Sequence, residues 1–172
     1  MTPRVFGITG WKNSGKTTLT ERLVTELVRR GYRVATIKHA HHDFDIDKPG
    51  TDSFRHRAAG AGEVAIVSRH RFAIMRELRD ETEPSLGEVI GRVSPCDIIL
   101  VEGYKKEHHK KIETRRLDAR DTSPLSPGDA NIVAVAADHD VTGEVLPVFD
   151  LDDVTGIADF IETTTGLTLR EP

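Results

Sequence analysis

The chain has 172 residues, of which 37% are hydrophobic and 30% are charged, and this balance excludes a disordered or fibrous protein. No stretch approaches eighteen apolar residues, so the sequence predicts no membrane span and no membrane partner. The one cysteine, Cys96, excludes an intramolecular disulfide and a cysteine-based zinc site. With no recognisable secretion signal, the sequence favours a cytoplasmic protein, and the length predicts a single domain over residues 1–172.

Charge is distributed unevenly around a net value of −4. Residues 1–117 carry 22 Lys and Arg against 16 Asp and Glu, whereas residues 118–172 carry 2 against 12. This asymmetry fits an acidic, solvated C-terminal part, or a first part that binds an anion. No region is basic enough to predict nucleic-acid binding.

In chain order, the N-terminal half begins with a strand over residues 4–9 and a glycine turn over residues 10–15. Apolar residues then recur at helical spacing up to Arg30, and Gly31 is placed to end that helix. Further elements are expected as a strand over 33–38, a loop over 39–50, a short helix over 51–59, and strands over 63–68 and 72–77.

The C-terminal half begins with Ser85 and Glu88 at the spacing of a capping box, which predicts a helix that ends near Pro95. The nearly all-apolar segments 97–101 and 132–137 are typical of strands buried on both faces. An added strand is expected over 112–117, a short one over 146–149, and a closing helix over 152–164 with Asp152 or Asp153 at its start.

This order of elements predicts an α/β fold with three layers, in which a mostly parallel sheet carries helices on both faces, as in P-loop NTPases. The segments 63–77 and 104–117 interrupt the alternation of strands and helices. They are therefore expected to form added β-hairpins.

One motif carries the chemistry. Residues 10–17 read G-W-K-N-S-G-K-T and fit the phosphate-binding P-loop pattern between a predicted strand and a predicted helix. Backbone N–H groups and the helix N-terminus would hold the phosphates, Lys16 would reach the β- and γ-phosphates, and the hydroxyl of Thr17 suits Mg²⁺. The nucleotide-binding candidates in this segment are Gly10, Trp11, Lys12, Asn13, Ser14, Gly15, Lys16, Thr17 and Thr18.

A P-loop site also needs an acidic residue at the end of a neighbouring strand. Asp97 and Glu102 bracket the buried strand over 97–101. Ligands sit at the carboxyl ends of parallel strands, so Glu102 is predicted to bind Mg²⁺ and to be, with Lys16, a catalytic residue. Asp97 is interpreted as a cap or turn residue.

Two polar segments leave alternatives open. The loop with His39, His41, His42 and His56 carries several carboxylates, and it fits a transition-metal site, a polar loop over the nucleotide with Asp52 near the metal, or a solvated loop. The run over 105–111 fits a solvated turn or an anion-binding or partner-docking hairpin.

The segments G-W-K-N-S-G-K-T-T-L, Ile37–Ala61 and D-I-I-L-V-E-G-Y-K resemble the MobB family of accessory proteins in molybdopterin-guanine dinucleotide biosynthesis. The resemblance implies a GTP-binding homodimer with weak GTPase activity that assists the guanylyltransferase joining GMP to molybdopterin, and it raises molybdopterin as a further ligand. It also implies that Thr17 and Glu102 attend Mg²⁺, and that Asp52, Arg55 and His56 belong to a ligand loop.

No N-K-x-D guanine motif is present, and the nearest candidate for reading guanine is Asp138, after the strand over 132–137. The resemblance implies GTP, whereas the sequence alone leaves ATP open. Two rival functions remain at this point: a GTP-dependent metallochaperone that uses the histidine-rich loop, and a small-molecule kinase on a P-loop scaffold.

Overall fold

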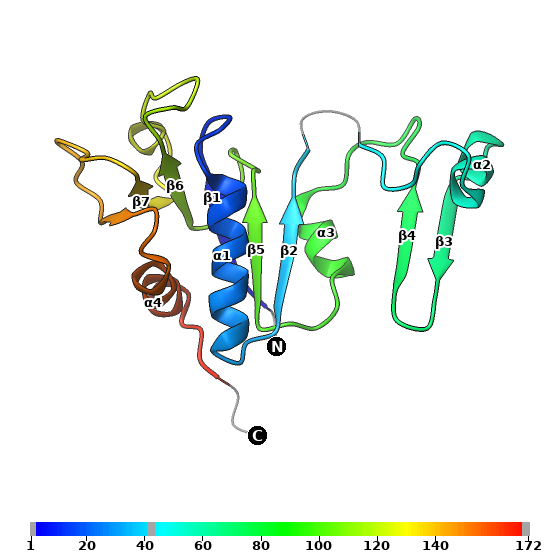
Figure 1. Ribbon diagram of the computed structural model, residues 1–172, viewed down its shortest axis with the longest axis horizontal. Coiled ribbons are helices and arrows are strands. Elements are labelled where there is room, and N and C mark those ends of the chain that lie inside the picture. Colours follow the sequence, from blue (N-terminus) through cyan, green and yellow to red (C-terminus); the bar gives the residue numbers. More distant parts are fainter. Residues whose placement is uncertain (1–2, 41–43, 170–172) are drawn as a thin grey trace. The chain divides into compact units, whose positions relative to one another are not determined.

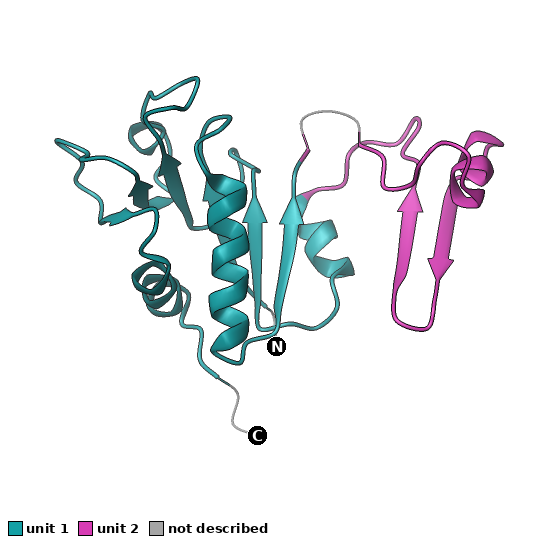
Figure 2. Cartoon of the chain, viewed as in Figure 1, with its two compact units in different colours: residues 1–39, 86–172 teal, residues 40–85 magenta. Residues whose placement is uncertain are grey.

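The computed structural model describes residues 3–40 and 44–169 of the chain. It divides the chain into two compact units, residues 1–39 with 86–172 and residues 40–85 (Figure 2). The expectation of a single nucleotide-binding domain over 1–172 stays a prediction. None of the helices in the described residues is both long and apolar enough to cross a membrane.

A six-stranded sheet forms the centre of the first unit (Figure 1). All pairs of neighbouring strands are parallel, as predicted. Their order across the sheet is β2-β5-β1-β6-β7-β8. The strands are β1 (Arg4–Thr9), β2 (Val34–Lys38), β5 (Ile98–Glu102), β6 (Lys111–Arg115), β7 (Ile132–Ala137) and β8 (Val148–Asp150).

Helices cover both faces of this sheet, which confirms the predicted fold class. Alternate residues of a strand point to opposite faces. On β5, Ile98 and Leu100 pack with α1 (Lys16–Arg29) and α4 (Val154–Thr165) in one core. Ile99 and Val101 pack with α3 (Leu86–Arg92) in another.

The helix ends follow the sequence signals. Gly31, just past α1, has φ = 94°, a conformation that favours glycine and ends the helix where predicted. Asp153 caps α4, since its carboxylate accepts a hydrogen bond of 3.0 Å from the Gly156 N–H. Of the two predicted residues, Asp152 and Asp153, Asp153 is therefore the N-cap of α4.

The prediction of a hairpin over 104–117 is wrong. The strand expected there is β6, a buried member of the sheet that runs parallel to β1 and β7. The connection from β5 to β6 can be short because the two strands pair with adjacent residues of β1. Glu102, the last residue of β5, pairs with Ile8, and Lys111, the first residue of β6, pairs with Gly7. The chain crosses β1 at Gly7, where a Cβ atom would clash with the ring of His109 and lie 2.8 Å from its Cδ2.

The lysine that closes this connection is part of the fold. Lys111 is fully buried, and its ammonium group donates to the carbonyl oxygens of Lys105 and Glu107 and to Asp129, at 2.9, 2.7 and 2.9 Å. After β6 a long loop contains the short helix η1 (Ser126–Gly128). Part of the basic run 105–111 is thus internal structure and not a solvated turn.

The second unit holds the other predicted hairpin. Strands β3 (Glu63–Val67) and β4 (Phe72–Arg76) pair antiparallel, which confirms it, and α2 (Asp52–Ala58) precedes them. Arg57 joins the unit's segments through ion pairs of 2.6 Å to Asp47 and 2.8 Å to Glu77. His41, His42 and Asp43, part of the predicted ligand loop, lie outside the described residues.

Candidate functional site

The P-loop joins the end of β1 to the start of α1 at the carboxyl edge of the sheet (Figure 1). Gly15 caps α1 with φ = 95°, and Asn13 has φ = 66°, so the backbone curls tightly before the helix. A Cβ atom at Gly10 would fall 2.6 Å from the Thr114 hydroxyl oxygen. The first N–H groups of the helix have no partner within it, so this loop presents unpaired donors to an anion.

Lys16 is folded back over this loop. Its ammonium group donates to the carbonyl oxygens of Gly10, at 3.2 Å, and of Trp11, at 2.7 Å. Burial lowers the pKa of Lys16, and the positive charges of Lys105 and Lys38 lower it further, whereas Glu102 raises it. A partly buried cation held by neutral carbonyl groups gains from an anion placed beside it.

Glu102 lies beside the start of α1, as predicted. The Thr17 hydroxyl donates to its Oε1 at 2.9 Å, and Lys38 lies 3.2 Å from the same oxygen. Glu102 is only 8% exposed, so these two neighbours replace contacts with water that its carboxylate lacks. A hydroxyl and a carboxylate side by side are the hard oxygen ligands that Mg²⁺ prefers, and the two residues therefore fit a magnesium site.

Two residues outside the P-loop, which the sequence did not reveal as its partners, hold it in place. The hydroxyl of Thr114, on β6, lies 2.7 Å from that of Ser14 and donates to the Thr9 carbonyl oxygen at 3.1 Å. The Trp11 indole donates to the Ser123 carbonyl oxygen at 2.7 Å. No local sequence signal marks these partners, since they lie about a hundred residues away in the chain.

Lys105 belongs to the same edge. Its ammonium group lies 3.8 Å from the centre of the Trp11 ring, a cation–π contact. Burial lowers the pKa of Lys105. The basic run thus places one cation against the P-loop.

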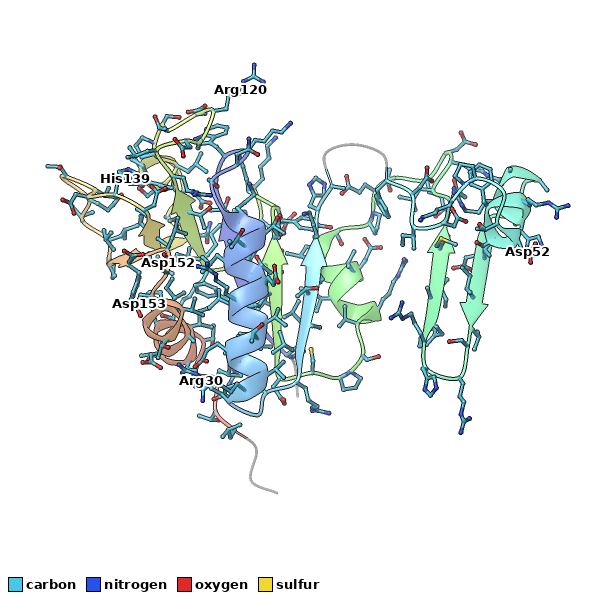
Figure 3. All side chains as sticks on the ribbon, in the orientation of Figure 1. Arg30, Asp52, Arg120, His139, Asp152 and Asp153 are labelled. Atoms are coloured by element: carbon cyan, nitrogen blue, oxygen red, sulfur yellow. The ribbon has the colours of Figure 1, made fainter. Side chains whose placement is uncertain are left out.

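Asp138 comes to the P-loop side through Arg116. The aliphatic part of Arg116 packs over Gly15, where a Cβ atom would lie 3.3 Å from its Cδ, and its guanidinium group donates to Asp138 at 3.3 Å. Asp138 also accepts from the Leu117 N–H at 3.1 Å and contacts Nδ1 of His139, labelled in Figure 3, at 2.8 Å. The His139 hydrogen bond lowers the pKa of Asp138, which keeps the carboxylate ionised.

Beside this edge, β6 carries a buried charged network that the sequence analysis did not identify. Arg115 donates to Glu113 at 2.7 Å and to Glu144 at 2.8 Å, and Glu113 accepts from the backbone N–H groups of Leu125 and Ser126. The network fixes the loop after β6, the same loop that supplies the Ser123 carbonyl to Trp11.

Asp52 and Arg55 belong to the second unit, on α2. Their side chains are exposed and lie 3.9 Å apart. Their predicted contact with the nucleotide or with Mg²⁺ stays a prediction. Across residues 3–40 and 44–169, no three or more histidine, cysteine or acidic side chains converge as they would around a metal ion.

Comparisons with known proteins find relatives along most of the chain. The family model MobB, described as Molybdopterin guanine dinucleotide synthesis protein B, matches residues 5–138. A Molybdopterin-guanine dinucleotide biosynthesis adapter protein of Escherichia coli (strain K12) is 40% identical over 159 residues, 91% of this chain and 90% of that protein. A protein of the same name from Haemophilus influenzae is 39% identical over 159 residues, 92% and 87% of the two chains.

A solved structure agrees with the fold. The structure of a MobB protein homolog from Bacillus stearothermophilus is 29% identical, covers 95% of this chain and 99% of that chain, and superposes with a TM-score of 0.72. The region matched by the family model includes the P-loop, Glu102 and Asp138.

Proposed function

Because the chain belongs to the MobB family, we propose that it binds GTP with Mg²⁺ at the P-loop and acts as an adapter in the biosynthesis of molybdopterin guanine dinucleotide. The observation that carries the nucleotide part is the placement of Lys16, Thr17 and Glu102 around one loop at the carboxyl edge of the sheet. The names of the relatives support the biosynthetic part.

Phosphate binding follows from the loop. Backbone N–H groups of residues 10–18 and the N-terminus of α1 receive the phosphates. Lys16 exchanges the carbonyl oxygens of Gly10 and Trp11 for phosphate oxygens, which replaces two neutral acceptors with charged ones.

Thr17 and Glu102 would hold Mg²⁺ through their adjacent hydroxyl and carboxylate oxygens. An ion held there would supply positive charge to neutralise the phosphates of the nucleotide. Hydrolysis is slow, since Lys16, the loop N–H groups and the ion stabilise charge while no side chain is assigned to orient the attacking water. The protein thus serves as a binding module more than as a GTPase.

Asp138 reads guanine. Its carboxylate accepts hydrogen bonds from the N1 and N2 groups of the base, and its lowered pKa keeps it an acceptor. Its link through Arg116 to Gly15 supports a base on this side of the P-loop.

The proposed partner is the guanylyltransferase that joins GMP to molybdopterin, with molybdopterin itself as a further ligand. The protein acts as a homodimer in the cytoplasm. The β3–β4 hairpin supports self-association, since Val67 and Phe72 are 75% and 68% exposed on an unpaired two-stranded sheet. Sedimentation of a species of about 19 kDa at micromolar concentration would contradict the dimer.

Isothermal titration with GTP, GDP and ATP, with and without Mg²⁺, tests nucleotide binding. Lys16→Ala should weaken GTP binding by about 10- to 100-fold, because hydrogen bonds to charged groups contribute about 1.5–3 kcal/mol. Lys106→Ala, an exposed lysine on the connection between β5 and β6, is the matched control and should bind as the wild type does. Unchanged GTP affinity in a folded Lys16→Ala protein would refute the proposal.

A further inference from the structure

The ammonium group of Lys38 lies against both oxygen ligands of the magnesium site. It is 3.2 Å from Oε1 of Glu102 and 3.4 Å from Oγ1 of Thr17. These two oxygens are 2.9 Å apart, so the three atoms form a compact triangle. We propose that the ammonium group of Lys38 occupies this site as a counter-cation when no metal is bound. When Mg²⁺ binds the same two oxygens, the ammonium group leaves them and binds the nucleotide phosphates; this role rests on the proposed function.

The register of the sheet builds the contact. Lys38 is the last residue of β2, Glu102 is the last residue of β5, and the two are paired in the parallel ladder. Paired residues on neighbouring strands project from the same face, so Lys38 is directed to Glu102 by its place in the sheet. Thr17 meets them from the first turn of α1.

Charge explains why a cation is needed. The side chain of Glu102 is 10% exposed, and a carboxylate so far from water needs a compensating partner. Lys16 is held by the loop carbonyl groups of Gly10 and Trp11. Lys38 therefore supplies the direct ion pair that stabilises ionised Glu102 when no metal is bound.

Exposure explains why this cation can leave. The Lys38 side chain is 60% exposed, so its ammonium group returns to water at little cost. A divalent ion bound to Glu102 and Thr17 would repel an ammonium group only a few ångströms away. The freed lysine lies beside the N-terminus of α1, where the phosphates are expected to bind.

Two consequences follow. The nucleotide-free protein should bind divalent ions weakly, because Lys38 competes for their ligands. The protein should also retain part of its GTP affinity without Mg²⁺, because Lys38 then serves as a phosphate-binding cation.

The experiment uses the full chain and Mn²⁺ as a spectroscopic probe for the divalent ion. Electron paramagnetic resonance measures Mn²⁺ binding to the nucleotide-free protein, and titration measures GTP binding in EDTA. Lys38→Met should bind Mn²⁺ about 5-fold more tightly and GTP in EDTA about 5-fold more weakly, the factors that correspond to about 1 kcal/mol. Lys38→Arg keeps the cation and should stay near the wild type, as should the control Lys106→Met.

The effect must depend on the carboxylate. In a Glu102→Gln background, Lys38→Met should leave Mn²⁺ affinity unchanged, because no charged ligand remains to be uncovered. Mn²⁺ affinity of Lys38→Met equal to or below that of the wild type would overturn the proposal. If the wild type did not bind GTP, the proposed function would be refuted. The Mn²⁺ measurement on nucleotide-free protein would still decide the role of Lys38.

Discussion

Replacement of Thr114 by valine removes one hydroxyl group from beneath the P-loop and keeps the shape of the side chain. Thr114 and Ser14 are each 1% exposed. Since the single hydroxyl hydrogen of Thr114 is donated to the Thr9 carbonyl oxygen, the Ser14 hydroxyl must be the donor in the contact of 2.7 Å between the two side chains. Thr114→Val therefore leaves the buried Ser14 hydroxyl without its acceptor.

The size of the effect follows from that loss. A buried polar group left unsatisfied costs about 1–3 kcal/mol, so Thr114→Val should lower the free energy of unfolding by about that amount. Thr114→Ser keeps the hydroxyl and loses one methyl group, which costs about 0.8 kcal/mol from burial. The expected order of stability is wild type, then Thr114→Ser, then Thr114→Val.

Urea unfolding at pH 7 measures these differences. Trp11 is the one tryptophan of the chain and lies in the P-loop, so its fluorescence reports on the affected segment, and circular dichroism reports on the whole. The double variant Ser14→Ala/Thr114→Val should be non-additive by about 0.5–3 kcal/mol, as expected for residues in contact. A Thr114→Val protein more stable than Thr114→Ser would refute the reasoning, since packing alone would then explain the site.

Two further predictions concern single side chains. Burial lowers the pKa of His109 from 6.5 to about 4, so the unfolded chain binds a proton at a higher pH than the folded protein does. The free energy of unfolding should therefore fall as the pH drops from about 6.5 to 4, with a slope approaching about 1.4 kcal/mol per pH unit. In urea unfolding across this pH range, His109→Gln should lose this pH dependence, whereas the control His108→Gln, an exposed neighbour, should keep it. Equal slopes in the wild type and both variants would contradict the assignment of the pH dependence to His109. Asp153→Ala removes the cap of α4 and should destabilise the protein by about 1 kcal/mol in thermal unfolding. Asp152→Ala, an exposed neighbour that pairs with Arg22 (both aspartates are labelled in Figure 3), should cost less than about 0.5 kcal/mol, and the reverse order would show that Asp153 is not the effective cap.

The sequence alone predicted the features that contiguous residues encode. The P-loop is recognisable because one short segment supplies its glycines, Lys16 and Thr17, and the start of α4 because Asp153 accepts from an N–H three residues away. The hairpin over 63–77 follows from two strand-like segments and a short turn. Glu102 could be predicted because parallel strands end at one edge, and a buried apolar strand precedes it.

Only the tertiary structure decided which strands meet. The sequence of β6, K-I-E-T-R, has one apolar residue among four polar ones, yet the strand is buried because Lys111, Glu113 and Arg115 are paired internally. The contacts of Thr114 with Ser14, of Lys38 with Glu102 and of His109 with Gly7 all join segments far apart in the chain. They depend on strand order and register, which arise from the packing of the whole sheet, and no local pattern of residues specifies them.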